Sequence, residues 1–138
     1  MAAVKQARIK NTRQIRTENK GSTVALALGE IVDLTAGLVV SATSSSTRDT
    51  VLGVCAQTIA TADAATRVDV LIPGKEDTFL FTTTNNTDSA HNGQAMIIGA
   101  NSTTINNTGT TSAVGVVVQV EPYGTAASKQ ILGRFIIS

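Results

Sequence analysis

The apolar residues of this chain fall into short runs separated by glycine, asparagine and threonine, a pattern typical of β-strands joined by turns. The clearest series spans residues 29–54, where three clusters rich in valine and leucine are punctuated by Gly29, Gly37 and Gly53. Gly37 stands where a tight turn requires a positive φ, so the first two clusters predict a β-hairpin. The whole stretch predicts a β-meander.

The rest of the chain continues this pattern with little aromatic content. Further strands are expected at 21–28, 68–72, 77–84, 94–99, 113–120 and 131–137. In the strand at 77–84, Phe79 and Phe81 share one face and should form the aromatic part of the core. The predicted fold class is all-β: a compact β-sandwich or small β-barrel of about 8–10 short strands with an extended N-terminal arm.

Two of these strands are predicted from alternation alone. In the first, Val24, Leu26 and Leu28 alternate with small residues and should point the same way. In the strand at 113–120, four valines at every second position should share one face: Val114, Val116, Val118 and Val120.

Two polar stretches interrupt the body. Residues 85–93 predict a long turn region, and residues 101–112, which are almost entirely Asn, Thr, Ser and Gly, are the least structured part of the body by composition. We expect the second stretch to lie at an exposed edge or tip that tolerates insertions.

The small net charge of +1 hides a strong asymmetry along the chain. Residues 1–20 contain six basic residues and one acidic residue, whereas residues 21–138 contain five basic and nine acidic residues. The first segment also has few apolar residues, so it should not pack against its own domain. The sequence therefore predicts a basic extended arm at 1–20, a single β domain at 21–138, and a body that still folds without the arm.

Regularly spaced cations on an extended segment can reach the carboxylates of a protein surface or the phosphates of a nucleic acid. Charge alone does not decide between these two partners. A solvated tail that binds no partner is a third possibility. Either ionic contact would weaken with salt. The candidate binding residues of the arm are Lys5, Arg8, Ile9, Lys10, Arg13, Ile15, Arg16 and Lys20.

Residue types that carry chemistry are sparse. Cys55 is the single cysteine and has apolar neighbours, which favours a buried thiol. His91 is the single histidine and lies in a polar stretch, where we expect it to be exposed. The scattered carboxylates match no calcium loop, and no glycine-rich phosphate loop is present. We therefore expect no catalytic residues, no metal site and no cofactor, and we interpret the protein as a non-enzyme.

The order of these features resembles that of the small capsid decoration (cement) proteins of tailed bacteriophages. The resemblance rests on a basic N-terminal segment, then G-E-I-V-D-L-T-A-G-L-V-V, then V-L-G-V at Val51 to Val54, then a Val-rich β body that ends in an apolar strand. It implies a structural viral protein on the outer surface of the phage head that stabilises the shell, with the major capsid protein as partner. It also implies a homotrimer, which suits an aromatic-poor core.

Two other classes of function remain open at this point. An adhesion or carbohydrate-binding β module on a virion or cell surface would explain the polar stretches, but Tyr123 is the only Tyr or Trp that could stack on a sugar. A nucleic-acid-binding protein would use the basic segment, but the acidic body has no basic platform, so we expect no nucleic-acid partner. The chain has no apolar run long enough to span a membrane, so we expect no membrane partner.

Overall fold

The structure, a computed structural model, describes residues 4–8, 14–20, 25–59, 67–110, 114–124 and 128–136. These residues form eleven strands and one short 3₁₀ helix, η1 (Ser89–His91). The strands are β1 (Val4–Arg8), β2 (Gln14–Asn19), β3 (Ile31–Thr35), β4 (Leu38–Ser41), β5 (Val51–Cys55), β6 (Arg67–Ile72), β7 (Thr78–Thr82), β8 (Ala95–Ile98), β9 (Ile105–Thr110), β10 (Val117–Pro122) and β11 (Gln130–Phe135). The predicted all-β fold class is confirmed. The helix η1 is too short to cross a membrane, and the described residues contain no other.

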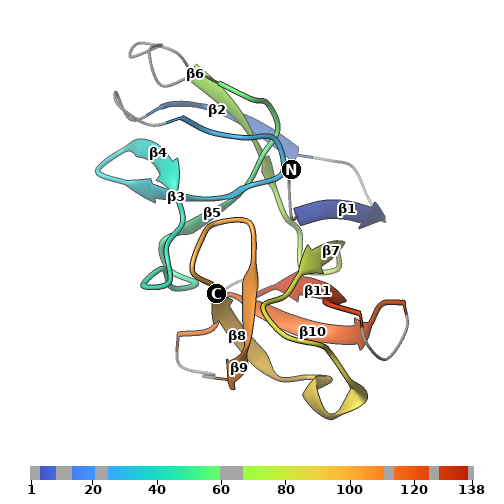
Figure 1. The fold of residues 1–138 in the computed structure, drawn as a ribbon. Helices are drawn as coiled ribbons and strands as arrows, with labels where there is room; N and C mark the ends of the chain where they lie inside the picture. The colour runs from blue at the N-terminus through green and yellow to red at the C-terminus, as the bar shows by residue number, and fades with distance from the viewer. Residues whose placement is uncertain are drawn as a thin grey trace.

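The strands form two antiparallel sheets, which occupy the two ends of the molecule in Figure 1. The six-stranded sheet has the order β1-β7-β11-β10-β8-β9, and the five-stranded sheet has the order β2-β6-β5-β3-β4. Each sheet also curls. Lys20, directly after β2, bridges Val39 of β4, and Thr83, directly after β7, bridges Ile105 of β9.

The described residues form two apolar clusters. The larger one contains most of the inward side chains of the six-stranded sheet together with Ile31, Val54 and Leu71 of the five-stranded sheet, so it joins the two sheets as in a β-sandwich. The smaller cluster lies on the opposite face of the five-stranded sheet and includes Val32 and Val70. The five-stranded sheet is therefore buried on both faces.

The hairpin and the aromatic core are confirmed. In the turn between β3 and β4, Ala36 and Gly37 both have positive φ values of 51° and 80°, which is the backbone of a type I′ hairpin turn. Phe79 and Phe81 are fully buried, and each ring packs edge-on against Phe135, with centroids 5.3 and 5.4 Å away. The three phenylalanines of the chain therefore form one cluster.

The prediction for residues 101–112 is right about the edge and wrong about the lack of structure and the exposure. Ile105–Thr110 form β9, which pairs with β8 at the edge of the six-stranded sheet, and Ser102, Ile105 and Asn107 are buried. The physical reason is that buried amide and hydroxyl groups here find protein hydrogen-bond partners in place of water, so a polar composition does not place the segment at the surface.

The alternation predicted around two strands is also wrong. Leu26 is buried and Leu28 is 55% exposed, and residues 25–30 contribute a single bridge, between Leu26 and Ile59, in place of a strand. In the strand expected at 113–120, Val114 and Val120 are exposed, while Val117 and Gln119 are buried. The reason is that β10 starts only at Val117. The alternation within the strand therefore buries Val117 and Gln119, and not the residues expected from an alternation that starts at Val114.

Candidate functional site

The described parts of the first twenty residues belong to both sheets. β1 forms an edge of the six-stranded sheet and pairs with β7, with Lys5 opposite Leu80 and Arg8 opposite Thr78. β2 forms an edge of the five-stranded sheet and pairs with β6 over all six of its residues. These two segments are strands of the body, which differs from the expectation of a separate extended arm. Main-chain pairing requires no apolar side chains, so a basic segment can join a sheet.

β2 exposes an apolar and a charged side chain at consecutive positions. Ile15 is 53% exposed, and Arg16 is exposed next to it. The guanidinium of Arg16 contacts Glu18 through Nε at 2.6 Å and Nη2 at 2.5 Å. An ion pair at the surface adds little to stability, but it holds the Arg16 side chain along the strand. Ile15 and Arg16 are thus two predicted binding residues that the structure places at the surface, on opposite faces of β2 at the edge of the sheet.

The other predicted binding residues are placed differently. Lys20 is only 2% exposed, at the bridge between β2 and β4, so it belongs to the interior of the fold and is not a surface contact. Burial of its alkyl chain where the sheet closes explains this position. Ile9, Lys10 and Arg13 lie outside the described residues.

The strand β2 is fastened to β6 by side chains as well as by its main chain. Thr17 Oγ1 donates to Asp69 Oδ1 at 2.7 Å, and Arg67 Nη2 donates to the carbonyl of Thr17 at 3.0 Å. These contacts fix the register in which Ile15 and Arg16 reach the surface. Sequence reasoning missed them because they join residues about fifty positions apart.

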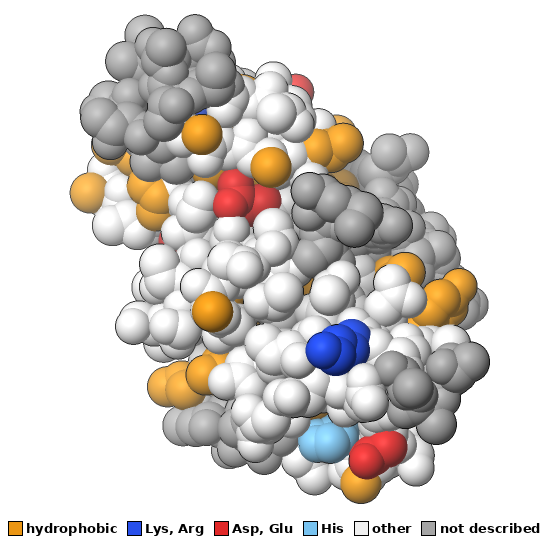
Figure 2. Space-filling view, viewed as in Figure 1, with side chains coloured by type: hydrophobic (Ala, Val, Ile, Leu, Met, Phe, Trp, Pro, Cys, Tyr) orange, Lys and Arg blue, Asp and Glu red, His pale blue; other side chains and the backbone are white. Residues whose placement is uncertain are grey.

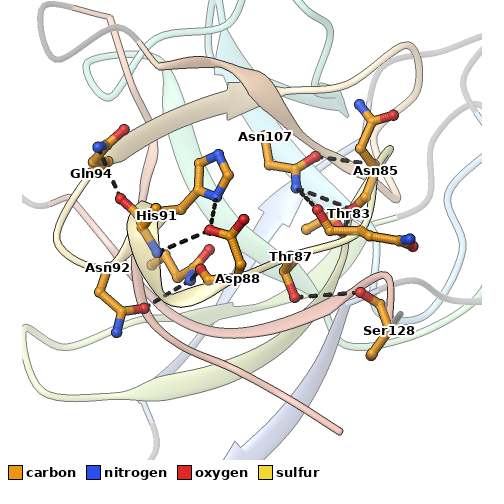
Figure 3. A network of polar contacts seen from close by, with 12 residues as sticks. Thr83, Asn85, Thr87, Asp88, His91, Asn92, Gln94, Asn107 and Ser128 are labelled. Carbon is orange, nitrogen blue, oxygen red and sulfur yellow. Dashed lines mark hydrogen bonds and ion pairs between the residues drawn. The ribbon is translucent and has the colours of Figure 1, made fainter. Parts of the chain in front are cut away.

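A polar network closes one end of the six-stranded sheet, as Figure 3 shows. Asn107 is one of its buried members: its amide oxygen accepts from Asn85 N at 3.0 Å, and its amide nitrogen donates to the carbonyls of Asn85 and Asn86 at 3.1 and 3.2 Å. Thr83 Oγ1 also donates to the Asn85 carbonyl, at 2.7 Å. The Asn side chain therefore replaces water for three main-chain groups of the turn after β7.

The second half of this network surrounds η1. Asp88 caps the helix by accepting from Ala90 N, and it also contacts His91 Nδ1 at 3.1 Å. The fully buried Gln119 donates to the Asp88 carbonyl and to Asn92 Oδ1, at 2.9 and 2.8 Å. His91 is thus half-buried and held by Asp88, where we had expected an exposed loop residue. These contacts build a rigid turn.

Two carboxylates are buried at the start of β3. Glu30 accepts from Ala27 N at 3.0 Å, from Ser41 Oγ at 2.9 Å and from Ser102 Oγ. Because Ser102 precedes β9, Glu30 ties the two sheets together. Asp33 accepts from Ser46 Oγ, and burial raises the pKa of Asp33 although hydrogen bonds from Ser46 and Thr50 oppose this shift.

The remaining candidate groups are dispersed. In the described part of the chain, no three His, Cys, Asp or Glu side chains are grouped so as to hold a metal ion. The hydrophobic side chains that reach the face shown in Figure 2 form several small groups that are separated by polar surface. The strongest arrangement for contacting a partner is therefore the N-terminal pair of edge strands.

Cys55 provides a direct check of the packing. It is 1% exposed, its thiol donates to the carbonyl of Gln57 at 2.9 Å, and burial is the main cause that raises the pKa of the thiol. We expect iodoacetamide to leave Cys55 unmodified in the native protein at neutral pH and to alkylate it fully in urea, as measured by intact mass. Rapid alkylation without denaturant would contradict the buried position.

The comparisons with known proteins give no relative. No protein-family model matches this chain, and no curated protein matches it.

Proposed function

We propose that this chain is a structural virion protein: a capsid decoration (cement) protein that binds the outer surface of a phage head and stabilises the shell. The major capsid protein is its proposed partner. The proposal starts from the resemblance in sequence order and is supported by the arrangement of the N-terminal strands.

The observation that carries the proposal is the position of the basic segment. Residues 1–20 hold six of the eleven basic residues of the chain, and the described parts of this segment form one edge strand on each sheet. Edge strands offer unpaired main-chain groups to a partner, and basic side chains beside them favour an acidic surface. These features offer a partner two edge strands, one on each sheet.

The proposal includes the homotrimer that the resemblance implies. Several large apolar side chains are exposed and would be covered between copies or against the shell. They are Ile15, Leu28, Leu38, Val114, Val120 and Tyr123.

The test is binding of the purified protein to DNA-free heads assembled from the shell protein of the same genome. We expect the double variant Ile15→Glu, Arg16→Glu to bind at least about tenfold more weakly, because it reverses one charge and adds another at the next position of β2. Binding of the unmodified protein should also weaken as salt is raised.

The matched control is Lys129→Glu, which reverses one basic charge, as Arg16→Glu does, at an exposed position beyond the N-terminal strands. It should bind as tightly as the unmodified protein. Equal binding by all three proteins would show that the N-terminal strands are not part of the interface. Absence of saturable binding to heads would overturn the proposed function.

A further inference from the structure

A small pocket opens on the seam between the two sheets. Its volume is about 190 Å³. Val51 and Leu52 of β5 and Ile72 of β6 line it from one sheet, and Phe135 of β11 lines it from the other. The lining is completed by Pro73, Val116, Ile136 and Arg48. Seven of the eight lining side chains are apolar, so the wall favours an apolar group.

The size of the pocket limits what can enter it. Pockets for whole small-molecule ligands usually measure about 300–1,000 Å³, whereas an apolar cavity of about 150 Å³ accommodates a single benzene ring. The pocket therefore matches one apolar side chain and is too small for a whole ligand. A single side chain that is buried in a pocket of its partner can carry much of the binding energy of a protein–protein contact.

Arg48 supplies the charge at this site. It is the only charged side chain of the lining, it is exposed, and it forms no ion pair with a described carboxylate even though Asp49 follows it in the chain. The turn that carries it is fixed: Thr50 N and Val51 N both donate to the carbonyl of Thr47, at 3.0 and 3.1 Å. A guanidinium held beside an apolar wall favours a carboxylate next to an apolar group.

We propose that this pocket binds one aliphatic side chain of a partner polypeptide, with a carboxylate beside that side chain contacting Arg48. Because the pocket is lined by both sheets, the occupant also braces the sheets against each other. This site is separate from the N-terminal strands, so its test does not depend on the proposed attachment to a phage head.

The experiment uses N-acetyl-leucine as the probe and N-acetyl-leucinamide, which lacks the carboxylate, as its neutral counterpart. Titration of the full chain to tens of millimolar, followed by amide NMR shifts, should give saturable changes at Val51, Ile72 and Phe135, with stronger binding of the acid. The acid should also raise the melting temperature, since it binds the folded state. Changes that do not saturate, or that centre elsewhere, would overturn the proposal.

Variants separate the charge from the pocket. Arg48→Gln should weaken the binding of N-acetyl-leucine about three- to fivefold and leave the binding of N-acetyl-leucinamide unchanged. The control Arg134→Gln, on the exposed side of β11, should change the binding of neither probe. A third probe, leucinamide, has a free amino group and is a cation. Arg48→Glu should reverse the preference for a negatively charged probe, so that leucinamide binds this variant better than N-acetyl-leucine does. An unchanged preference in Arg48→Glu would refute the role of Arg48 even if Arg48→Gln had a small effect.

A second variant tests occupation of the pocket itself. Val51→Phe should fill the space and abolish binding of both probes. The amide spectrum reports whether this variant folds. If it does not fold, the reversal expected in Arg48→Glu still decides the proposal.

Discussion

Deletion of residues 2–20 is expected to lower the free energy of unfolding by about 3–6 kcal/mol and to abolish binding to heads. The deletion removes two edge strands, so the main-chain groups of β6 and β7 lose the partners that Gln14–Asn19 and Val4–Arg8 provide. Each lost hydrogen bond costs about 0.5–1.5 kcal/mol, and the total stability of a domain is only about 5–15 kcal/mol. Urea unfolding followed by circular dichroism measures this loss.

Deletion of residues 2–8 is the matched control, because it removes β1 and keeps β2. We expect a smaller loss of stability and partial retention of binding, since Ile15 and Arg16 remain in place. If deletion of residues 2–20 changed the free energy of unfolding by less than about 1 kcal/mol, then the N-terminal segment would be a separate arm after all.

The substitution Asn107→Ala is expected to destabilise the protein by about 2–4 kcal/mol. Asn107 is 2% exposed and bonds the turn after β7 through both atoms of its amide. Alanine would remove these partners from Asn85 N and from the carbonyls of Asn85 and Asn86, at a partly buried place. The midpoint of urea unfolding should fall with little change in its slope.

The neighbouring Asn106 provides the control for this substitution. Its side chain is half-buried and accepts only from Thr108 N at 3.0 Å and Thr108 Oγ1 at 2.6 Å. We expect Asn106→Ala to cost less than about 1 kcal/mol. Equal and small effects of the two substitutions would show that residues 101–112 are the tolerant surface stretch that their composition suggests.

The parts of the fold that the sequence predicts are those governed by local rules. Gly37 indicates a turn because few other residue types adopt a positive φ as readily as glycine does. This turn predicts the hairpin of β3 and β4. Phe79 and Phe81 alternate along one strand, and the core forms around them. In these cases a residue type and its spacing are enough to fix the local structure.

The parts that the sequence does not predict depend on contacts between distant residues. Four of the six described side chains at 15–20 are exposed, so β2 carries no hydrophobic alternation and its pairing with β6 leaves no trace in its own sequence. Asn107 is buried only because the turn at 85–86 supplies its partners. The start of β10 at Val117 decides which valines are buried, and composition does not indicate that position.

The candidate site shows the same division. Charge counting locates the basic segment at 1–20, but only the structure separates the exposed Ile15 and Arg16 from the buried Lys20. The pocket at Arg48 has no sequence signal, because its lining comes from five separate stretches of the two sheets. Surface sites of this kind emerge from packing.

Electron microscopy of particles that carry the protein tests the central proposal most directly. The protein would be tagged at its C-terminus, expressed in cells in which the encoding virus assembles, purified, and imaged with whatever it retains. We expect icosahedral shells with this chain at one fixed site on the outer surface and with β1 and β2 facing the shell. Shells without the chain on their outer surface, or contacts made by the η1 end with the N-terminal strands facing solvent, would contradict the account.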